Sequence, residues 1–360
     1  MPLIWCSISA HGFGHAAQVV PVLNELGRRV PNLRALLRTE VPAAFFQPRL
    51  TIPWELRPAP QDIGCIQDGP LTIDVEGTWA AHRLYLADWS GKVAAEAREI
   101  IAAKATLVLS DIAPLGVAAG VAAGIPSIGM CSLSWDVVLE ALQAPRANDH
   151  PAIIEQIRAA YGEADRFLRV APALSVSAFP QVTEIGPIAE PAPPERERLR
   201  QAMGAREADR LILVGFGGIP LKQLPFAAME RMSHARFVLD GVVPEGYQRI
   251  RSLSTLGMPF KSLLASCDLI FTKPGYGTFV EAVALRTPVV YVRRFNFADE
   301  ESLIGYLHRF GRGAELSREA FSNGLWEPTI EALLKTPMPA TPPPALSGPG
   351  DAAAILEKYF

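Results

Sequence analysis

Residues 269–282 read Leu-Ile-Phe-Thr-Lys-Pro-Gly-Tyr-Gly-Thr-Phe-Val-Glu-Ala, and this stretch decides the fold. The first four residues are apolar or β-branched and predict a short buried strand over residues 269–272. Two glycines then open a turn, and the apolar spacing after them predicts a helix over residues 276–285. A buried strand that leads through a glycine-rich turn into a helix is typical of a parallel sheet covered by helices on both faces.

The same unit recurs on both sides of this stretch. Further strands are predicted at residues 3–9, 105–110, 126–131, 211–215, 236–239 and 288–292. Residues 188–198 are polar, rich in proline and without an apolar period, which is typical of a linker. We therefore expect an N-terminal α/β domain over residues 1–188, a linker over 189–198, a second α/β domain over 199–345 and a closing helix within 346–360.

Composition and charge exclude several classes of protein. The chain has 360 residues, 49% of them hydrophobic and 20% charged, which is enough for a large buried core. Its net charge of −3 offers no positive field for a nucleic-acid backbone. The four cysteines form no close pair, and no N-terminal apolar run is long enough to span a membrane. We expect a cytoplasmic protein without a transmembrane segment that binds no nucleic acid, with peripheral membrane contact left open.

A loop with glycines and histidines, residues 10–15, follows the first predicted strand. Gly12 and Gly14 would let a ligand approach the backbone where the carboxyl ends of parallel strands open a crevice. The loop fails as a dinucleotide fingerprint, because no acidic residue convincingly closes a second strand. An imidazole titrates near neutral pH and can take a proton from a hydroxyl, so we predict His15 as a general base, with His11 in reserve. A histidine that only caps the helix is the alternative.

Polar residues also follow two later strands of the first half. Asp111 comes directly after the strand at 105–110, and a carboxylate there could orient His15. An aspartate that caps the next helix is an equally good explanation. Ser134, Trp135 and Asp136 follow the strand at 126–131 and could line an acceptor side, although a core position explains Trp135 more simply.

The turn that opens the helix at residue 276 predicts a diphosphate site. The free N–H groups of the helix start, the Thr278 hydroxyl and the Lys273 ammonium suit an anion, and Glu281 could accept both hydroxyls of a ribose. A turn needed only for packing is the alternative. The other predicted ligand contacts are Gly217 and Gly218 for phosphate or ribose, Met258 for the base, Gly275, Tyr276 and Gly277 at the turn, and Asn296 and Glu300 for sugar hydroxyls. At the start of a helix, Glu300 could equally be a partner of the helix dipole.

Taken together, the loop that ends in Gly14-His15 and the Pro-Gly-Tyr-Gly-Thr segment before Glu281 resemble the GT-B glycosyltransferases. A more specific likeness is to the glycosyltransferase-like N-terminal region of plant L-arabinokinase. It rests on residues 10–16, 110–111, 134–136, 216–218, 275–278 and 292–294. The likeness extends over most of the chain, from residue 4 to residue 335. Ala10 stands where that family has a glycine, and Lys273-Pro274 departs slightly from its pattern.

The resemblance implies a fold of two Rossmann-like domains that face a central cleft, with the acceptor on the first and the nucleotide sugar on the second. It implies a catalytic His15, a ribose-binding Glu281 and an inverting transferase whose donor is a nucleotide diphosphate sugar, expected to be UDP-linked. The sequence holds no Asp-x-Asp pair, so we expect neither a metal nor another cofactor. It also holds no GxxxxGK loop and ends before a kinase domain could begin, so kinase activity is not expected.

Other activities fit the same fold. A nucleotide-sugar hydrolase, a 2-epimerase and a binding protein without turnover are the alternatives. The sequence does not predict the sugar, the acceptor or the oligomeric state.

Overall fold

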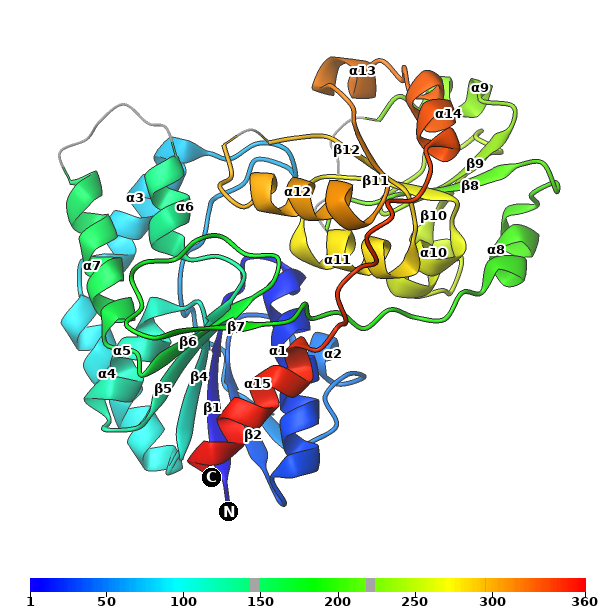
Figure 1. Ribbon diagram of the computed structural model, residues 1–360. Coiled ribbons are helices and arrows are strands. Elements are labelled where there is room, and N and C mark those ends of the chain that lie inside the picture. The colour runs from blue at the N-terminus through cyan, green and yellow to red at the C-terminus, as the bar shows by residue number, and fades with distance from the viewer. Residues whose placement is uncertain (143–148, 218–223, 295) are drawn as a thin grey trace.

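The computed structural model describes residues 1–142, 149–217, 224–294 and 296–360. Within these ranges it contains two parallel sheets, each covered by helices (Figure 1). The first sheet has the strand order β3-β2-β1-β4-β5-β6-β7 and the second has the order β10-β9-β8-β11-β12-β13. These two Rossmann-like sheets confirm the predicted α/β class.

The N-terminal domain contains the seven-stranded sheet. Its strands are β1 (Leu3–Ile8), β2 (Arg34–Arg38), β3 (Trp54–Leu56), β4 (Leu107–Asp111), β5 (Ser127–Cys131), β6 (Arg166–Val170) and β7 (Val182–Ile185). Its helices are α1 (Phe13–Arg29), α2 (Ala43–Phe46), α3 (Val75–Leu86), α4 (Trp89–Ala103), α5 (Pro114–Ala122), α6 (Trp135–Ala141) and α7 (His150–Gly162). Helices cover both faces of the sheet, so the central strands β4 and β5 are buried along their whole length.

The C-terminal domain contains the six-stranded sheet. Its strands are β8 (Arg210–Val214), β9 (Ala235–Leu239), β10 (Ile250–Ser252), β11 (Leu269–Thr272), β12 (Val289–Tyr291) and β13 (Gly313–Glu315). Its helices are α8 (Arg196–Met203), α9 (Phe226–Arg231), η1 (Leu253–Thr255), α10 (Phe260–Ser266), α11 (Tyr276–Leu285), α12 (Glu300–Phe310), α13 (Arg318–Ser322) and α14 (Glu327–Lys335). Aromatic side chains fill one side of the sheet, where the Trp326 ring stacks on Phe271 with their centroids 4.5 Å apart.

The chain crosses between the domains twice (Figure 1). The first crossing follows β7, and α8 begins at Arg196, so residues 196–198 of the predicted linker are helical. The second crossing follows α14 and returns to the N-terminal domain, where α15 (Gly348–Leu356) and η2 (Glu357–Tyr359) complete the chain. There α15 packs against α1, and Asp351 Oδ2 accepts a hydrogen bond from the Gly186 amide at 2.9 Å.

The loops after β1 and β11 meet between the two domains. Helices α1 and α11, which follow these loops, contact each other. Tyr276, the first residue of α11, donates its hydroxyl hydrogen to the Ala171 carbonyl at 2.8 Å and accepts from the Ile188 amide at 2.9 Å. The carboxyl ends of both sheets therefore face the space between the domains, which is where open parallel sheets bind ligands.

Two sequence expectations concern the environment of the protein. All four cysteines are buried and free. Over the described ranges, no helix is both long enough and apolar enough to cross a membrane.

Candidate active site

A buried histidine and a buried carboxylate meet at the carboxyl ends of β1 and β4. Gly12, with φ of 84°, adopts a conformation that favours glycine and turns the chain into α1, so that His15 lies in its first turn. His15 Nδ1 lies 3.1 Å from Asp111 Oδ2 and 3.3 Å from Oδ1. Asp111 ends β4 directly opposite Ile8 of β1, so the register of the sheet brings together two residues 96 positions apart.

The charge of Asp111 controls the protonation of His15. Burial disfavours a charged imidazole, but the Asp111 charge and its hydrogen bond outweigh burial and raise the pKa of His15 well above 6.5. Because Nδ1 faces the carboxylate, Nε2 is the nitrogen that points away from it. The pair thus has the geometry of a general base with an orienting carboxylate.

Cys131, at the end of β5, is the third group of this cluster. Its Sγ lies 3.8 Å from His15 Nδ1, and donor atoms of Cys131, His15 and Asp111 all lie within 4.8 Å of one another. These are groups that could hold a metal ion. Burial raises the pKa of the Cys131 thiol, so a metal bound here would have to displace its proton. We interpret His15 and Asp111 as an acid–base pair beside this thiol, and the absence of a metal stays a prediction.

His11 lies close to His15 but has both ring nitrogens engaged. Its Nδ1 accepts from the Cys65 amide at 3.3 Å, and its Nε2 bonds to the Gln67 carboxamide at 2.8 Å. Its ring stacks on Phe297 of the C-terminal domain, with centroids 6.2 Å apart. Burial, together with the charge of His15, lowers the pKa of His11 to about 3. These contacts leave no ring nitrogen for an acceptor hydroxyl, so we do not retain the reserve role for His11.

Asp62, a carboxylate close to His15, was not predicted from the sequence. Asp62 lies in the extended segment after β3, where Oδ1 accepts from the Ser9 hydroxyl at 3.0 Å and Oδ2 from the Trp135 indole at 2.7 Å. Burial raises the pKa of Asp62 to about 6, against the opposing charge of His15. No local motif surrounds this aspartate. Trp135 is fully buried and lines the site through Asp62 and the two histidine rings.

The turn before α11 has the features of an anion site. The first amides of α11 have no partner within the helix, as in any helix. The N-cap residue Gly275 has no side chain that could accept a hydrogen bond from them. Nothing lies within 4 Å of the place that a β-carbon would take on Gly277. Lys273 precedes the turn, and burial together with the Arg294 charge lowers the pKa of Lys273 to about 7. Gly217, with φ of 76°, borders the Lys273 side chain.

Other predicted ligand contacts lie around this turn, but some have side chains that are already engaged. The Tyr276 hydroxyl makes the two interdomain hydrogen bonds described above, so only its backbone is available to an anion. Met258 is 3% exposed and its side chain belongs to the core. Thr278 is the third residue of α11. Gly218 lies outside the described residues.

Glu281 lies one turn further along α11. Its Oε1 is 3.2 Å from Lys261 Nζ of α10, and burial raises the pKa of Glu281 despite this lysine. A ribose bound here would donate hydrogen bonds to a carboxylate that also pairs with Lys261.

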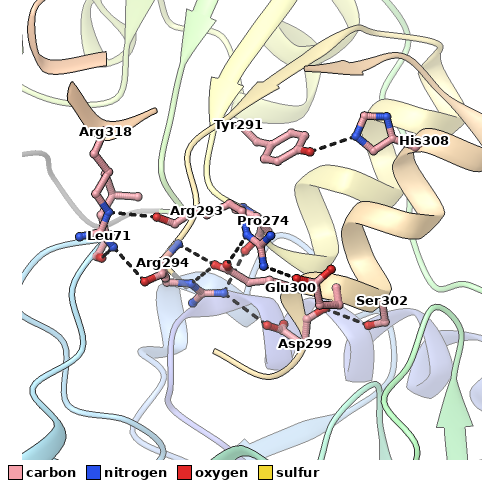
Figure 2. A network of polar contacts seen from close by, with 11 residues as sticks. Leu71, Pro274, Tyr291, Arg293, Arg294, Asp299, Glu300, Ser302, His308 and Arg318 are labelled. Carbon is pink, nitrogen blue, oxygen red and sulfur yellow. Dashed lines mark hydrogen bonds and ion pairs between the residues drawn. The ribbon is translucent and has the colours of Figure 1, made fainter. Parts of the chain in front are cut away.

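Figure 2 shows a network in the loop after β12 that changes the expected role of Glu300. Glu300 is 1% exposed, and its Oε1 accepts from the Arg294 amide at 3.0 Å and from Arg294 Nε at 2.9 Å. This carboxylate therefore holds Arg294. Its neighbour Asp299 lies 3.4 Å from Arg294 Nη2, and burial raises the pKa of Asp299 to about 6. We regard Asp299 as the better placed group for sugar hydroxyls, while Asn296 lies partly buried in the same loop.

The chain is similar to known proteins in sequence and in fold. No family model matches the chain. L-arabinokinase from Arabidopsis thaliana is 26% identical over 332 residues, which cover 90% of this chain and 31% of that protein. The chain thus spans about a third of the length of this relative.

Solved structures resemble both domains. The calicheamicin glycosyltransferase CalG4 matches with a TM-score of 0.67 and 16% identity, over 99% of this chain and 98% of that one. Medicago truncatula UGT71G1, solved with UDP-glucose, matches with a TM-score of 0.63 and 11% identity, over 99% and 94%. The chain has the GT-B glycosyltransferase fold, with distant sequence similarity to L-arabinokinase.

Proposed function

We propose that the protein is an inverting glycosyltransferase that moves a sugar from a UDP-linked donor to an acceptor hydroxyl without a metal ion. The His15–Asp111 pair carries the proposal, because it supplies a base with an orienting carboxylate at the meeting point of the two domains. UDP is supported by similar structures, since Medicago truncatula UGT71G1 was solved with UDP-glucose and a Siraitia grosvenorii transferase with UDP.

The reaction is a single displacement at the anomeric carbon. His15 Nε2 takes the proton of the acceptor hydroxyl while its oxygen forms the new bond to the anomeric carbon. The bond between that carbon and the diphosphate oxygen breaks on the opposite face, which inverts the configuration. Asp111 stabilises the imidazolium that forms. The N–H groups that begin α11 and the Lys273 side chain stabilise the negative charge that develops on the diphosphate.

The raised pKa of His15 gives this mechanism a definite pH dependence. A general base must be unprotonated, and a raised pKa keeps a large fraction of the imidazoles protonated at neutral pH. Therefore kcat/KM should rise with pH until the pKa of His15 is passed.

A thermal-shift screen of nucleotides and nucleotide sugars tests the proposal. A species that binds the folded state raises the melting temperature by mass action, and UDP and its sugars should do so selectively. His15→Ala should keep this shift and lose product formation, whereas His234→Ala, at an exposed histidine of the C-terminal domain, should keep both. Absence of any nucleotide shift, or product formation by His15→Ala, would refute the proposal. Sugar release from donor alone at the full rate would identify a hydrolase.

A further inference from the structure

A short hairpin of the N-terminal domain, residues 66–74, reaches across to the C-terminal domain. It lies between β3 and α3 and is closed by an antiparallel bridge between Gln67 and Ile73. His11 bonds to the start of the hairpin, through the amide of the preceding residue Cys65 and through the Gln67 side chain. Leu71 lies in the turn of the hairpin. The hairpin is thus anchored beside the proposed base, while its turn contacts the other domain.

Leu71 contacts the C-terminal domain through both its side chain and its backbone. The side chain packs against the core cluster of that domain, which includes Leu316 and Phe321. The Leu71 carbonyl accepts a hydrogen bond from Arg318, the first residue of α13 (Figure 2). The Arg318 guanidinium also donates to the carbonyls of residues 293 and 294 at 3.1 and 3.0 Å. One exposed side chain therefore joins the hairpin to the loop after β12.

Arg294 continues this connection toward the donor side. Its Nη2 donates to the Pro274 carbonyl at 3.0 Å, in the turn before α11, and lies 3.4 Å from Asp299 Oδ1. Its guanidinium also lies over the Phe297 ring, 4.0 Å from the centroid. Phe297 stacks on His11, which anchors the hairpin. The contacts therefore connect the hairpin to itself through the C-terminal domain. Arg318 binds the Leu71 and Arg294 carbonyls, Arg294 lies over Phe297, and Phe297 stacks on His11, which bonds to the hairpin.

We propose that Arg318 is a positioning residue for the donor sugar. It holds the main chain at residues 293–294, which keeps Arg294 and Asp299 in place, and it docks the hairpin on the same loop. This inference rests on the proposed function. Sugar binding at Asp299 and docking of the hairpin must then strengthen each other by the same factor. UDP alone lacks the sugar that Asp299 would bind, so it should strengthen docking less than UDP-glucose does.

Arg318→Met removes the hydrogen bonds to the carbonyls of residues 71, 293 and 294 at an exposed position, so the variant should fold. Arg309→Met is the matched control, because Arg309 is an exposed arginine of the same domain that lies over the Phe310 ring. Amide hydrogen exchange of residues 64–75 is measured without ligand, with UDP and with UDP-glucose. The wild type and the control should exchange more slowly with UDP-glucose than with UDP, and Arg318→Met should exchange faster in all three conditions.

Kinetics separate positioning from a general loss of structure. In Arg318→Met, KM for UDP-glucose should rise about tenfold, as expected for loss of hydrogen bonds from a charged group, while the Kd for UDP should change less than about twofold. Arg318→Lys should recover part of the loss, since an ammonium can still reach some of the carbonyls. Equal hairpin exchange in ligand-free wild type and Arg318→Met would overturn the inference. Failure of the wild type to bind UDP or UDP-glucose would instead refute the proposed function, and the ligand-free comparison would still decide whether Arg318 docks the hairpin.

Discussion

Replacing Asp111 by asparagine removes the charge that keeps a buried His15 protonated. Asparagine preserves the size of the side chain and one acceptor oxygen for Nδ1, which lies 3.1–3.3 Å away. For unit charges 3.1 Å apart at an effective dielectric constant of about 20, the Coulomb attraction is about 5 kcal/mol. This is several times the ~1.4 kcal/mol that corresponds to one pKa unit, so the pKa of His15 should fall markedly. Burial, now unopposed by Asp111, then favours the neutral imidazole.

This shift changes both the pH profile and the maximum rate. In the wild type, kcat/KM should still be rising above neutral pH, whereas in Asp111→Asn it should level off below neutral pH. The level reached should be about 10²- to 10⁴-fold lower, because the base is weaker and its ring is less firmly oriented.

The direct measurement is an NMR titration of the His15 ring protons, assigned by comparison with His15→Gln. Glu99→Gln is the control, since Glu99 is an exposed carboxylate that pairs with Arg57. Should the His15 midpoint in Asp111→Asn stay within about half a unit of the wild-type value, the electrostatic reasoning would be wrong.

Three further predictions follow from the same site. Glu281→Ala should weaken UDP binding by about tenfold in calorimetry and leave the binding of 2′,3′-dideoxy-UDP unchanged, because the lost hydrogen bonds go to the ribose hydroxyls. An equal loss of affinity for both nucleotides would exclude the ribose contact. Asp62→Asn can keep its bonds to Ser9 and Trp135 while losing a group that titrates near pH 6. The acid side of the acceptor kcat/KM profile should therefore lose an inflection near pH 6 and keep the rise set by His15, with the UDP melting shift unchanged. An altered melting shift would instead make Asp62 part of the scaffold. Dialysis against a chelator should not reduce the transfer rate, and a rate restored only by Mn²⁺ or Mg²⁺ would contradict the metal-independent mechanism.

The elements around the proposed anion site could be predicted because their signals are local. The strand Leu269–Thr272 and the helix Tyr276–Leu285 have the bounds that their apolar spacing predicts. Gly275, before the helix, and Gly277, in its first turn, mark the turn for a local reason as well, because they have no side chains to cover the helix start. Local patterns also identified His15, at the end of the loop after one predicted strand, and Asp111, directly after another.

The roles of Glu300 and Tyr276 could not be predicted in this way. Both follow strands at the correct edge of the sheet, and both would fit a ligand site by position alone. Glu300 instead binds Arg294, and the Tyr276 hydroxyl binds backbone groups of residues 171 and 188. Asp62 shows the converse, since it lies in an irregular segment and reaches His15 only through the fold.

The sequence by itself determined the α/β class, the glycine-rich turns and the choice of His15 and Asp111 as candidates, and it left a helix-capping role open for both. Only the tertiary structure decided which of the candidate side chains are free to meet a ligand and which bind another part of the protein. The physical reason is that backbone conformation follows from neighbouring residues, whereas the partner and the charge state of a buried side chain depend on elements far away in the chain.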